Sequence, residues 1–422
     1  MDRGPILSFG FLRSHGRLIA FGFMMFFCSN VGQTFFISLF GGEIRAQFAL
    51  SHGQFGLVYT TATLASAMTL VWAGRFVDRL PLAVFAAAVL VALAGASLFM
   101  GVAWSVPTLI LALFGLRFFG QGLATHTALV AMARYFTAER GRTVSIASLG
   151  QTAGEAFLPA LVVASITVTA WRNIWTIAAG VLLVLLPLLL ILLKGHKARD
   201  QALIARQVAD RSSDSGSTLC EALRGAGLWL VLPADLAPSL IFSGLIIHQA
   251  HLAASKQWPP SLIGGSFTAF AVASLATLIV AGPLVDRITA QRLLPLSLVP
   301  LMLACLILLV ADAPLAAPVF LALLGISMGI TAILKGTLWP ELYGISNLGS
   351  IRAFGQSAMV LSSGVGPALL GFLFDAGYSV EVVVSALIFL CLLASALAVL
   401  GVRQCRRERL ARRLPPQSGA QK

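Results

Sequence analysis

Apolar residues occur along the chain in long runs, and short polar stretches separate one run from the next. Most runs are about 20 residues long, which as a helix rising about 1.5 Å per residue crosses the roughly 30 Å hydrocarbon core of a bilayer. The runs predict twelve transmembrane helices. Their residue ranges are 17–39, 53–73, 81–102, 106–133, 142–165, 172–193, 226–252, 261–285, 292–311, 315–339, 350–374 and 379–402.

Composition supports an integral membrane protein. Hydrophobic residues make up 58% of the chain and charged residues only 11%, whereas about a quarter of the residues of a soluble domain are charged. The basic residues 1–17 are followed by no small-residue cleavage site, so we expect helix 1 to stay in the protein. The five cysteines are scattered and odd in number, and we expect neither disulfides nor a metal site.

The net charge of +13 is explained by where the basic residues lie relative to the predicted helices. If both termini are cytoplasmic, 24 of the 29 Lys and Arg residues lie on that side, and the outer loops hold Arg45, Arg172 and Lys256. Because inner loops of membrane proteins are enriched in Lys and Arg, we expect both termini to be cytoplasmic. We expect the protein in the plasma membrane, the inner membrane of a bacterium. The basic tail 403–422 can contact anionic lipid head groups, and no nucleic-acid partner is needed.

A polar stretch at residues 194–225 predicts a cytoplasmic linker between two six-helix halves, residues 1–193 and 226–402. A repeat supports this division, because residues 65–79 align with residues 273–287. Both aligned segments end in the same pattern of a glycine, an aspartate four residues later and an arginine. These residues are Gly74, Asp78 and Arg79 in the first copy, and Gly282, Asp286 and Arg287 in the second.

This repeated pattern resembles the loops after helices 2 and 8 of the major facilitator superfamily. Arg117, followed by Gly120 and Gly122, looks like a second motif of that family in helix 4. A third motif matches only in part, because Glu155 stands where helix 5 of the family's drug antiporters has a proline. The resemblance implies an all-α membrane protein with twelve transmembrane helices in two pseudo-symmetric six-helix halves, which works by alternating access.

The resemblance also implies a gating role for the six loop residues. The two glycines permit close helix approach, and the aspartates Asp78 and Asp286 can accept hydrogen bonds from a helix N-terminus in one state. The alternative is that Arg79 and Arg287 only obey the bias of positive charge toward the cytoplasmic side.

Charged residues inside a membrane usually face a cavity or a partner, so each predicts a functional site. Arg117 suits bidentate binding of a carboxylate, or instead a structural hydrogen bond to a neighbouring helix. Lys335 could add a second cation or extend to the interface. Glu155 is the candidate for proton coupling, or a structural partner of Arg117. Asp235 is a second candidate for proton coupling, but we favour the alternative that it caps a broken helix.

Uncharged polar residues complete the predicted substrate site, since helices 1, 4, 7 and 10 line the cavity in the family that the chain resembles. They are Asn30, Gln33, Thr34, Gln121 and His248. Contacts between helices are the alternative role for this set. His248 and His251 have a spacing that suits a metal pair, but no third ligand is apparent, so no metal is expected.

The pattern as a whole predicts a secondary transporter of a small organic anion such as a monocarboxylate, working by proton symport and closest to the oxalate/formate and monocarboxylate branches. The alternative is a proton-driven exporter of drugs or amphipathic cations. No phosphate-binding loop, nucleophile set or signalling domain is present in the sequence, so ATP-driven transport, an enzyme and a receptor are disfavoured. We expect no cofactor, and as partners only the solute, protons and the lipid bilayer around a monomer.

Overall fold

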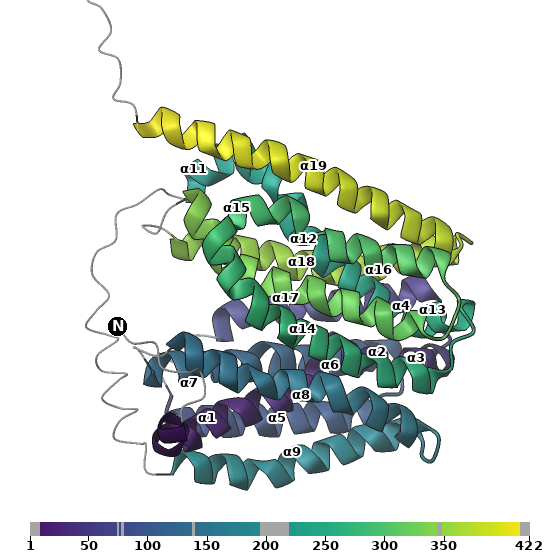
Figure 1. Ribbon diagram of the computed structural model, residues 1–422. Helices are drawn as coiled ribbons and strands as arrows, with labels where there is room; N and C mark the ends of the chain where they lie inside the picture. The colour runs from purple at the N-terminus through teal and green to yellow at the C-terminus, as the bar shows by residue number, and fades with distance from the viewer. Residues whose placement is uncertain are drawn as a thin grey trace, which may run out of the picture.

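The computed structural model describes residues 9–73, 76, 80–136, 140–194, 219–343 and 348–413, and within these ranges the side chains of residues 281–288 and of a few other helix residues are left out. The described residues form helices and turns and no strands, as the all-α prediction expects. Figure 1 shows long helices running side by side, with the helices of the first half of the chain on one side of the bundle and those of the second half on the other.

Helices of the first half are α1 (Phe9–Ser29), the short 3₁₀ turn η1 (Asn30–Gly32), α2 (Thr34–Ser38), α3 (Gly41–Phe48), α4 (His52–Ala73), α5 (Leu82–Val102), α6 (Val106–Gly115), the π-helical segment η3 (Leu116–Ala124), α7 (Thr125–Tyr135), α8 (Arg140–Ile166) and α9 (Trp171–Leu193).

Helices of the second half are α11 (Leu219–Arg224), α12 (Ala226–Ile247), α13 (Gln249–Ser255), α14 (Pro260–Ile288), α15 (Ala290–Leu293), the 3₁₀ turn η4 (Leu294–Leu296), α16 (Val299–Val310), α17 (Ala316–Tyr343), α18 (Leu348–Asp375) and α19 (Val380–Arg413). The predicted linker 194–225 lies mostly outside the described residues, and α11 falls at its end.

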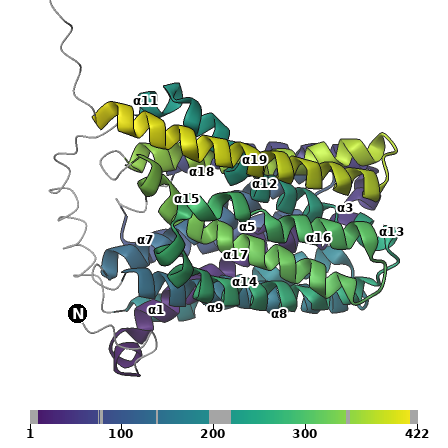
Figure 2. The same cartoon turned by 45° about the horizontal axis from the view of Figure 1, so that its top comes forward.

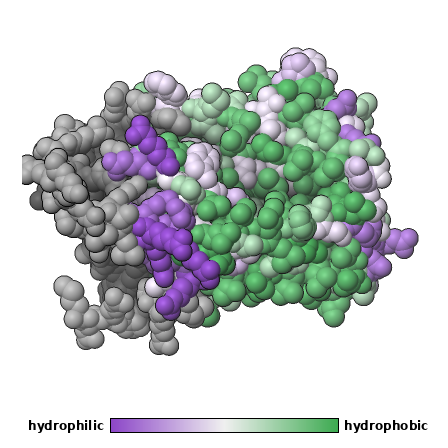
Figure 3. All heavy atoms as spheres, turned by 90° about the horizontal axis from the view of Figure 1, so that it is seen from above, coloured by the Kyte–Doolittle hydropathy of each residue, from purple (hydrophilic) through white to green (hydrophobic). Residues whose placement is uncertain are grey.

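Eleven segments of the described chain are long and apolar enough to cross a membrane. The predicted helix that is missing from this set is α4, whose 22 residues are long enough but include Thr60, Thr61, Thr63, Ser66 and Thr69. Apolar side chains cover the middle of the surface in Figure 3, and polar side chains gather at both ends of the helices. This belt is the surface expected of a protein surrounded by lipid.

Four helix predictions differ from the structure. The range 17–39 is not one helix, because α1 ends at Ser29 and a 3₁₀ turn and an extended residue separate it from α2. The range 226–252 ends early at Ile247, and 292–311 is interrupted between η4 and α16. The last helix continues past residue 402 to Arg413, so the first half of the predicted basic tail is helical.

We call the end of the bundle where α1 begins and α19 ends the terminal face, and the other end, which carries α3 and α13, the opposite face. Figure 2 shows both faces from a second direction. Glycines let helices of the two halves approach closely on the side of the opposite face. A Cβ on Gly56 of α4 would lie 2.3 Å from the carbonyl oxygen of Pro367 in α18, a separation that no side chain tolerates.

Candidate functional site

The first transmembrane segment is broken at Asn30 to Gln33, between α1 and the short helix α2. Gln33 adopts an extended backbone (φ −79°, ψ 153°), so the helical hydrogen-bond ladder stops there. The amide of Asn30 turns back and donates from Nδ2 to the carbonyl oxygen of Phe27 at 2.9 Å. This contact satisfies a carbonyl at the end of α1, which matters because no water reaches such groups in hydrocarbon.

The fourth transmembrane segment is wound as a π-helix next to this break. The segment η3 contains Arg117, Gly120, Gln121 and Gly122, all residues of the predicted motif or site. Single π-helical turns are rare and occur often at functional sites, and here the wide winding spans nine residues. Nothing in the sequence pattern of this run predicted that winding.

Arg117 joins the two irregular segments. Its Nη1 donates to the carbonyl oxygen of Gly32 at 3.3 Å and to Oγ1 of Thr34 at 3.1 Å. Its guanidinium lies over the ring of Tyr59, 5.2 Å from the centroid, and Tyr59 donates its hydroxyl to Thr34 at 2.8 Å. Tyr59 comes from α4 and belongs to no motif, so nothing in the sequence pointed to this residue.

Two glycines allow this close approach. A Cβ on Gly32 would lie 2.0 Å from the carbonyl oxygen of Leu116, and a Cβ on Gly120 would lie 2.7 Å from the Cα of Gly32. Gly154 of α8 similarly faces the amide of Asn30, where a Cβ would lie 2.0 Å from Nδ2. The break and the π-helix therefore pack backbone against backbone, and α8 packs against the side chain of Asn30.

The charge of Arg117 has no acidic partner among the described residues. The side chain is 2% exposed, its Nε atom makes no hydrogen bond, and every recorded contact is to a neutral group. The amide oxygen of Asn30 is also buried without a hydrogen bond. Removing a charge from water without a counter-charge is costly, so Arg117 is a poorly compensated charge in the described core.

Glu155 lies on α8, half-buried, one helical turn after Gln151. The amide Nε2 of Gln151 donates to Oε1 of Glu155 at 3.0 Å. The pairing of Glu155 with Arg117, one of the predicted alternatives, is not present in the structure. Gln121, on η3, is also half-buried, whereas Gln33 is 9% exposed at the break.

Lys335 and Asp235 form a second charged group, in the other half of the protein. Asp235 on α12 is 4% exposed and lies within electrostatic range of Lys335 on α17, but no ion pair within 4 Å joins these two described side chains, and Oδ2 of Asp235 makes no hydrogen bond. The two residues are 100 positions apart in the chain, so the sequence alone did not bring them together. The charge of Lys335 thus has an acidic group nearby, unlike that of Arg117.

His248 lies away from these groups, at the end of α12 on the opposite face. Its Nε2 donates to the carbonyl oxygen of Pro367 at 2.8 Å, and its ring contacts those of His52 and Phe374. It is therefore not brought together with Asn30, Gln33, Gln121 and Arg117 in this conformation.

The predicted gating residues cannot be compared with the structure. Gly74, Asp78 and Arg79 lie outside the described residues, and Gly282, Asp286 and Arg287 belong to α14 but their side chains are not described. Their role stays a prediction.

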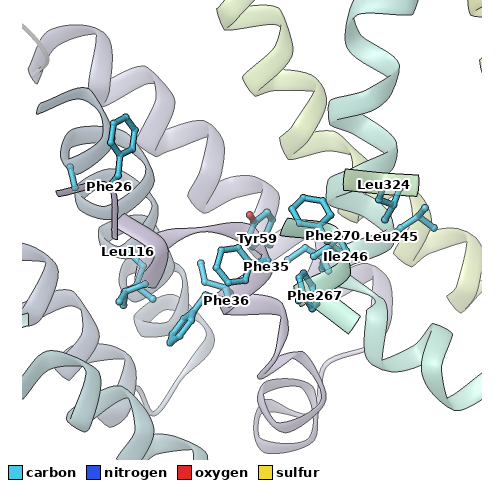
Figure 4. Close-up of a cluster of buried hydrophobic side chains, with 14 of the residues drawn as sticks. Phe26, Phe35, Phe36, Tyr59, Leu116, Leu245, Ile246, Phe267, Phe270 and Leu324 are labelled. Carbon is cyan, nitrogen blue, oxygen red and sulfur yellow. The ribbon is translucent and has the colours of Figure 1, made fainter. Parts of the chain in front are cut away.

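Contacts between the two halves gather toward the opposite face. Gln249 donates to Oγ of Ser38 at 2.9 Å, and Thr60 donates to the carbonyl oxygen of Gly364. Figure 4 shows Phe35, Phe36 and Tyr59 from the first half beside Phe267, Phe270 and Ile246 from the second; the rings of Phe35 and Phe267 are 5.9 Å apart. The two halves of the protein are thus in contact from the opposite face to about the middle of the bundle.

Comparisons with known proteins agree with this architecture. The family model of the Major Facilitator Superfamily matches residues 22–246 and again residues 217–420. Two solved structures of a bacterial homologue of the human lysosomal transporter Spinster, inward-facing and either unoccupied or occupied, each have a TM-score of 0.66 and 15% identity. The alignments cover 98% of this chain and 100% of the first structure, and 96% and 99% for the second. A search of curated proteins finds no match.

At 15% identity the solved structures show a shared fold and no more, whereas the two family matches together cover nearly the whole chain. The fold, the apolar belt and the duplicated match agree with one another. The chain belongs to the Major Facilitator Superfamily, and it is an integral membrane protein that works as a secondary transporter of small solutes and not as an enzyme.

Proposed function

We propose that the protein carries a small organic anion with a single negative charge, such as a monocarboxylate, together with a proton. The observation that supports this proposal is the buried charge of Arg117, which has neutral partners only among the described residues. A buried cation without a counter-charge is stabilised when an anion binds beside it. The substrate would supply the missing negative charge.

The other charged pair argues for one negative charge and not two. Asp235 already interacts with Lys335, so Arg117 is the cation left for the substrate among the described intramembrane residues. A guanidinium presents its donors in a planar fork that matches a carboxylate. The Nε atom, which makes no hydrogen bond, is one donor that Arg117 can offer to a carboxylate while it keeps its hydrogen bonds to Gly32 and Thr34.

Glu155 is the proposed proton carrier. It is half-buried at bilayer depth, and its recorded partner, Gln151, can hydrogen-bond to the carboxylate or to the protonated acid. A carboxyl group in such a position can take up and release a proton as the surrounding helices move. Asp235 is the second candidate carrier, because it too is a carboxyl group buried inside a transmembrane helix.

Orientation and movement follow from the same reasoning and are part of the proposal. Both termini face the cytoplasm of a bacterial inner membrane, because most basic residues lie on that side. The protein works as a monomer, in which residues 1–193 rock against residues 226–402. The linker 194–225 joins the halves, and the tail 403–422 contacts lipid head groups.

A thermal-shift panel on the purified protein in detergent tests the substrate class. Monocarboxylates, dicarboxylates, sugars and amphipathic cations are compared, because a ligand at 100 times its Kd stabilises the native state by about 2.7 kcal/mol. We expect a monocarboxylate to raise the melting temperature of the unmodified protein and to have no effect on Arg117→Ala.

Arg172→Ala is the matched control. Arg172 also donates to two backbone carbonyl oxygens, those of Gly101 and Ala103, at 2.8 Å and 2.6 Å, but it lies at the opposite face. Its removal costs similar hydrogen bonds and should leave the ligand-induced shift intact. Loss of the shift in both variants, or retention in both, would reduce Arg117 to a packing role.

A proton-driven exporter of drugs or amphipathic cations is the second candidate. The observation in its favour is the aromatic cluster between the halves, which includes Phe35, Phe267 and Phe270 and which an amphipathic compound could contact (Figure 4). A shift of the melting temperature with amphipathic cations alone would favour this candidate over anion transport.

A further inference from the structure

Asp375, the last residue of α18, holds the first turn of α4 at the opposite face. Its Oδ1 accepts a hydrogen bond from the backbone N–H of His52 at 2.9 Å, and its Oδ2 accepts from the N–H of Gly53 at 2.7 Å and from the hydroxyl of Ser51 at 2.5 Å. A carboxylate at a helix N-terminus gains both from these donors and from the helix dipole. Asp375 therefore caps a helix that belongs to the other half of the protein.

The surrounding backbone is fitted to this contact. A Cβ on Gly53 would lie 2.5 Å from the ring of Phe372 and 2.7 Å from the carboxylate of Asp375, and a Cβ on Gly371 would lie 2.4 Å from the carbonyl oxygen of His52. The two helix ends thus meet without intervening side chains. Because α4 and α18 belong to opposite halves, they must separate here if the protein is to open toward this face.

Three histidines and an arginine lie directly behind the contact. The ring of His52 on α4 is 4.4 Å from that of His251 on α13 and 5.6 Å from that of His248, measured between centroids. Nη1 of Arg45 on α3 lies 3.2 Å from Nε2 of His52. His52 and Arg45 come from the first half, and His248 and His251 from the second.

The hydrogen bond from Arg45 requires His52 to be unprotonated on Nε2. A guanidinium can only donate, so Nε2 must accept, and a protonated imidazole has no acceptor. Protonation of His52 would therefore break this contact and place two positive charges side by side. Protonation of His251 would add a third across the interface, and burial together with the charge of Arg45 already lowers the pKa of His251.

We propose that the contact of α4 with α18 is a gate at the opposite face, that the cap made by Asp375 is the lock that holds this gate closed, and that protonation of His52 and His251 releases the lock. The charged and titratable groups that face one another here are Arg45, His52, His248, His251 and Asp375. Asp375 is the single negative charge among them, and it offsets one positive charge only. Acidification at the opposite face would thus favour the open gate by repulsion across the interface.

The sign of the pH dependence follows from the closed state. The histidines bind protons less readily when the gate is closed than when it is open to water, so the closed state is favoured above about pH 6.5 and loses that advantage as the pH falls. This inference concerns the gate and holds whichever solute is carried.

Spin labels on the two halves measure the gate directly. The labels are placed at Gln47→Cys on α3 and Tyr378→Cys after α18, both exposed, in a background where the exposed Cys220 is replaced by serine. We expect one short distance at pH 8 in proteoliposomes, and an added population at longer distance in Asp375→Asn. Asp312→Asn is the matched control.

Asp312 is a carboxylate at the same face that pairs with Lys256, at 2.7 Å, within the second half only. Its replacement should leave the distance distribution unchanged. If the distance distribution of Asp375→Asn matches that of the unmodified protein, the proposed lock is refuted. Asp375→Glu keeps the charge and is expected to remain mostly closed, which separates loss of the lock from general damage to the fold.

The proton response is measured in the same way between pH 8 and pH 5.5. We expect the long-distance population of the unmodified protein to grow at least severalfold at the lower pH. In the double variant His52→Gln and His251→Gln, which keeps an acceptor for Arg45, this growth should be lost. A double variant that opens at low pH as the unmodified protein does would refute the role of the histidines.

Discussion

Replacing Gly32 by alanine adds one methyl group at the point where the broken first segment crosses the π-helical segment η3. The new Cβ would lie 2.0 Å from the carbonyl oxygen of Leu116 and 2.8 Å from the Cα of Gly120, where ordinary contact begins at 3.4 Å. Both neighbours are backbone atoms, so no side chain can turn away. The two segments must move apart by about an ångström or more.

The expected cost has two parts. Forcing a methyl group into a packed core costs about 1–3 kcal/mol. Moving the backbone of Gly32 also weakens the hydrogen bond that Arg117 donates to its carbonyl oxygen, and such bonds to charged groups contribute about 1.5–3 kcal/mol. We therefore expect a loss of about 2–5 kcal/mol, and with it a lower melting temperature and a large loss of transport.

Thermal unfolding in detergent and uptake into proteoliposomes are measured side by side with Gly95→Ala. A Cβ on Gly95, in the middle of α5, would meet no atom within 4 Å, and alanine is favoured over glycine in a helix by about 0.5–1 kcal/mol. The control should be as stable as the unmodified protein or more so. If Gly32→Ala matches Gly95→Ala in both assays, the close crossing of the two segments does not matter.

Two further predictions concern the charged side chains. Lys335→Met leaves the carboxylate of Asp235 buried without the nearby cation, so this variant should melt lower than the double variant Lys335→Met with Asp235→Asn. We expect a coupling free energy of about 0.5–3 kcal/mol from the two single variants and the double variant, and additive effects on thermal unfolding would contradict the interaction. Glu155→Gln removes the proposed proton carrier, so it should abolish solute accumulation driven by a pH gradient. Exchange of solute between equal concentrations on the two sides should continue. Accumulation of solute by this variant under a pH gradient would exclude Glu155 as the carrier.

Most helix positions could be predicted from the sequence because they depend on local properties. The range 81–102 corresponds to α5 (Leu82–Val102), and 172–193 to α9 (Trp171–Leu193). An apolar run of this length must satisfy its backbone internally in a bilayer, and a helix does so whatever lies beside it. The duplicated glycine, aspartate and arginine pattern identified the family for the same reason, since it is written in contiguous residues.

The site could be predicted only in part. Arg117 stood out because a charge in an apolar run is unusual, but its contacts with Gly32, Thr34 and Tyr59 come from segments far away in the chain. Asp375 drew no attention, because a carboxylate at the end of an apolar run is ordinary in a loop. Its contact with the first turn of α4 exists only because α18 packs beside α4 in the folded bundle.

The sequence by itself determined the membrane fold, most of its apolar helices, the internal repeat and the positions of the intramembrane charges, because hydrophobic length and motif spacing are properties of the chain alone. The break at Asn30 to Gln33, the π-helical winding around Arg117 and the proximity of Asp235 to Lys335 were decided by the tertiary structure. The physical reason is that, away from water, a broken helix or a buried charge is stable only where a neighbouring helix supplies its partner. Which helix that is depends on how the whole bundle packs.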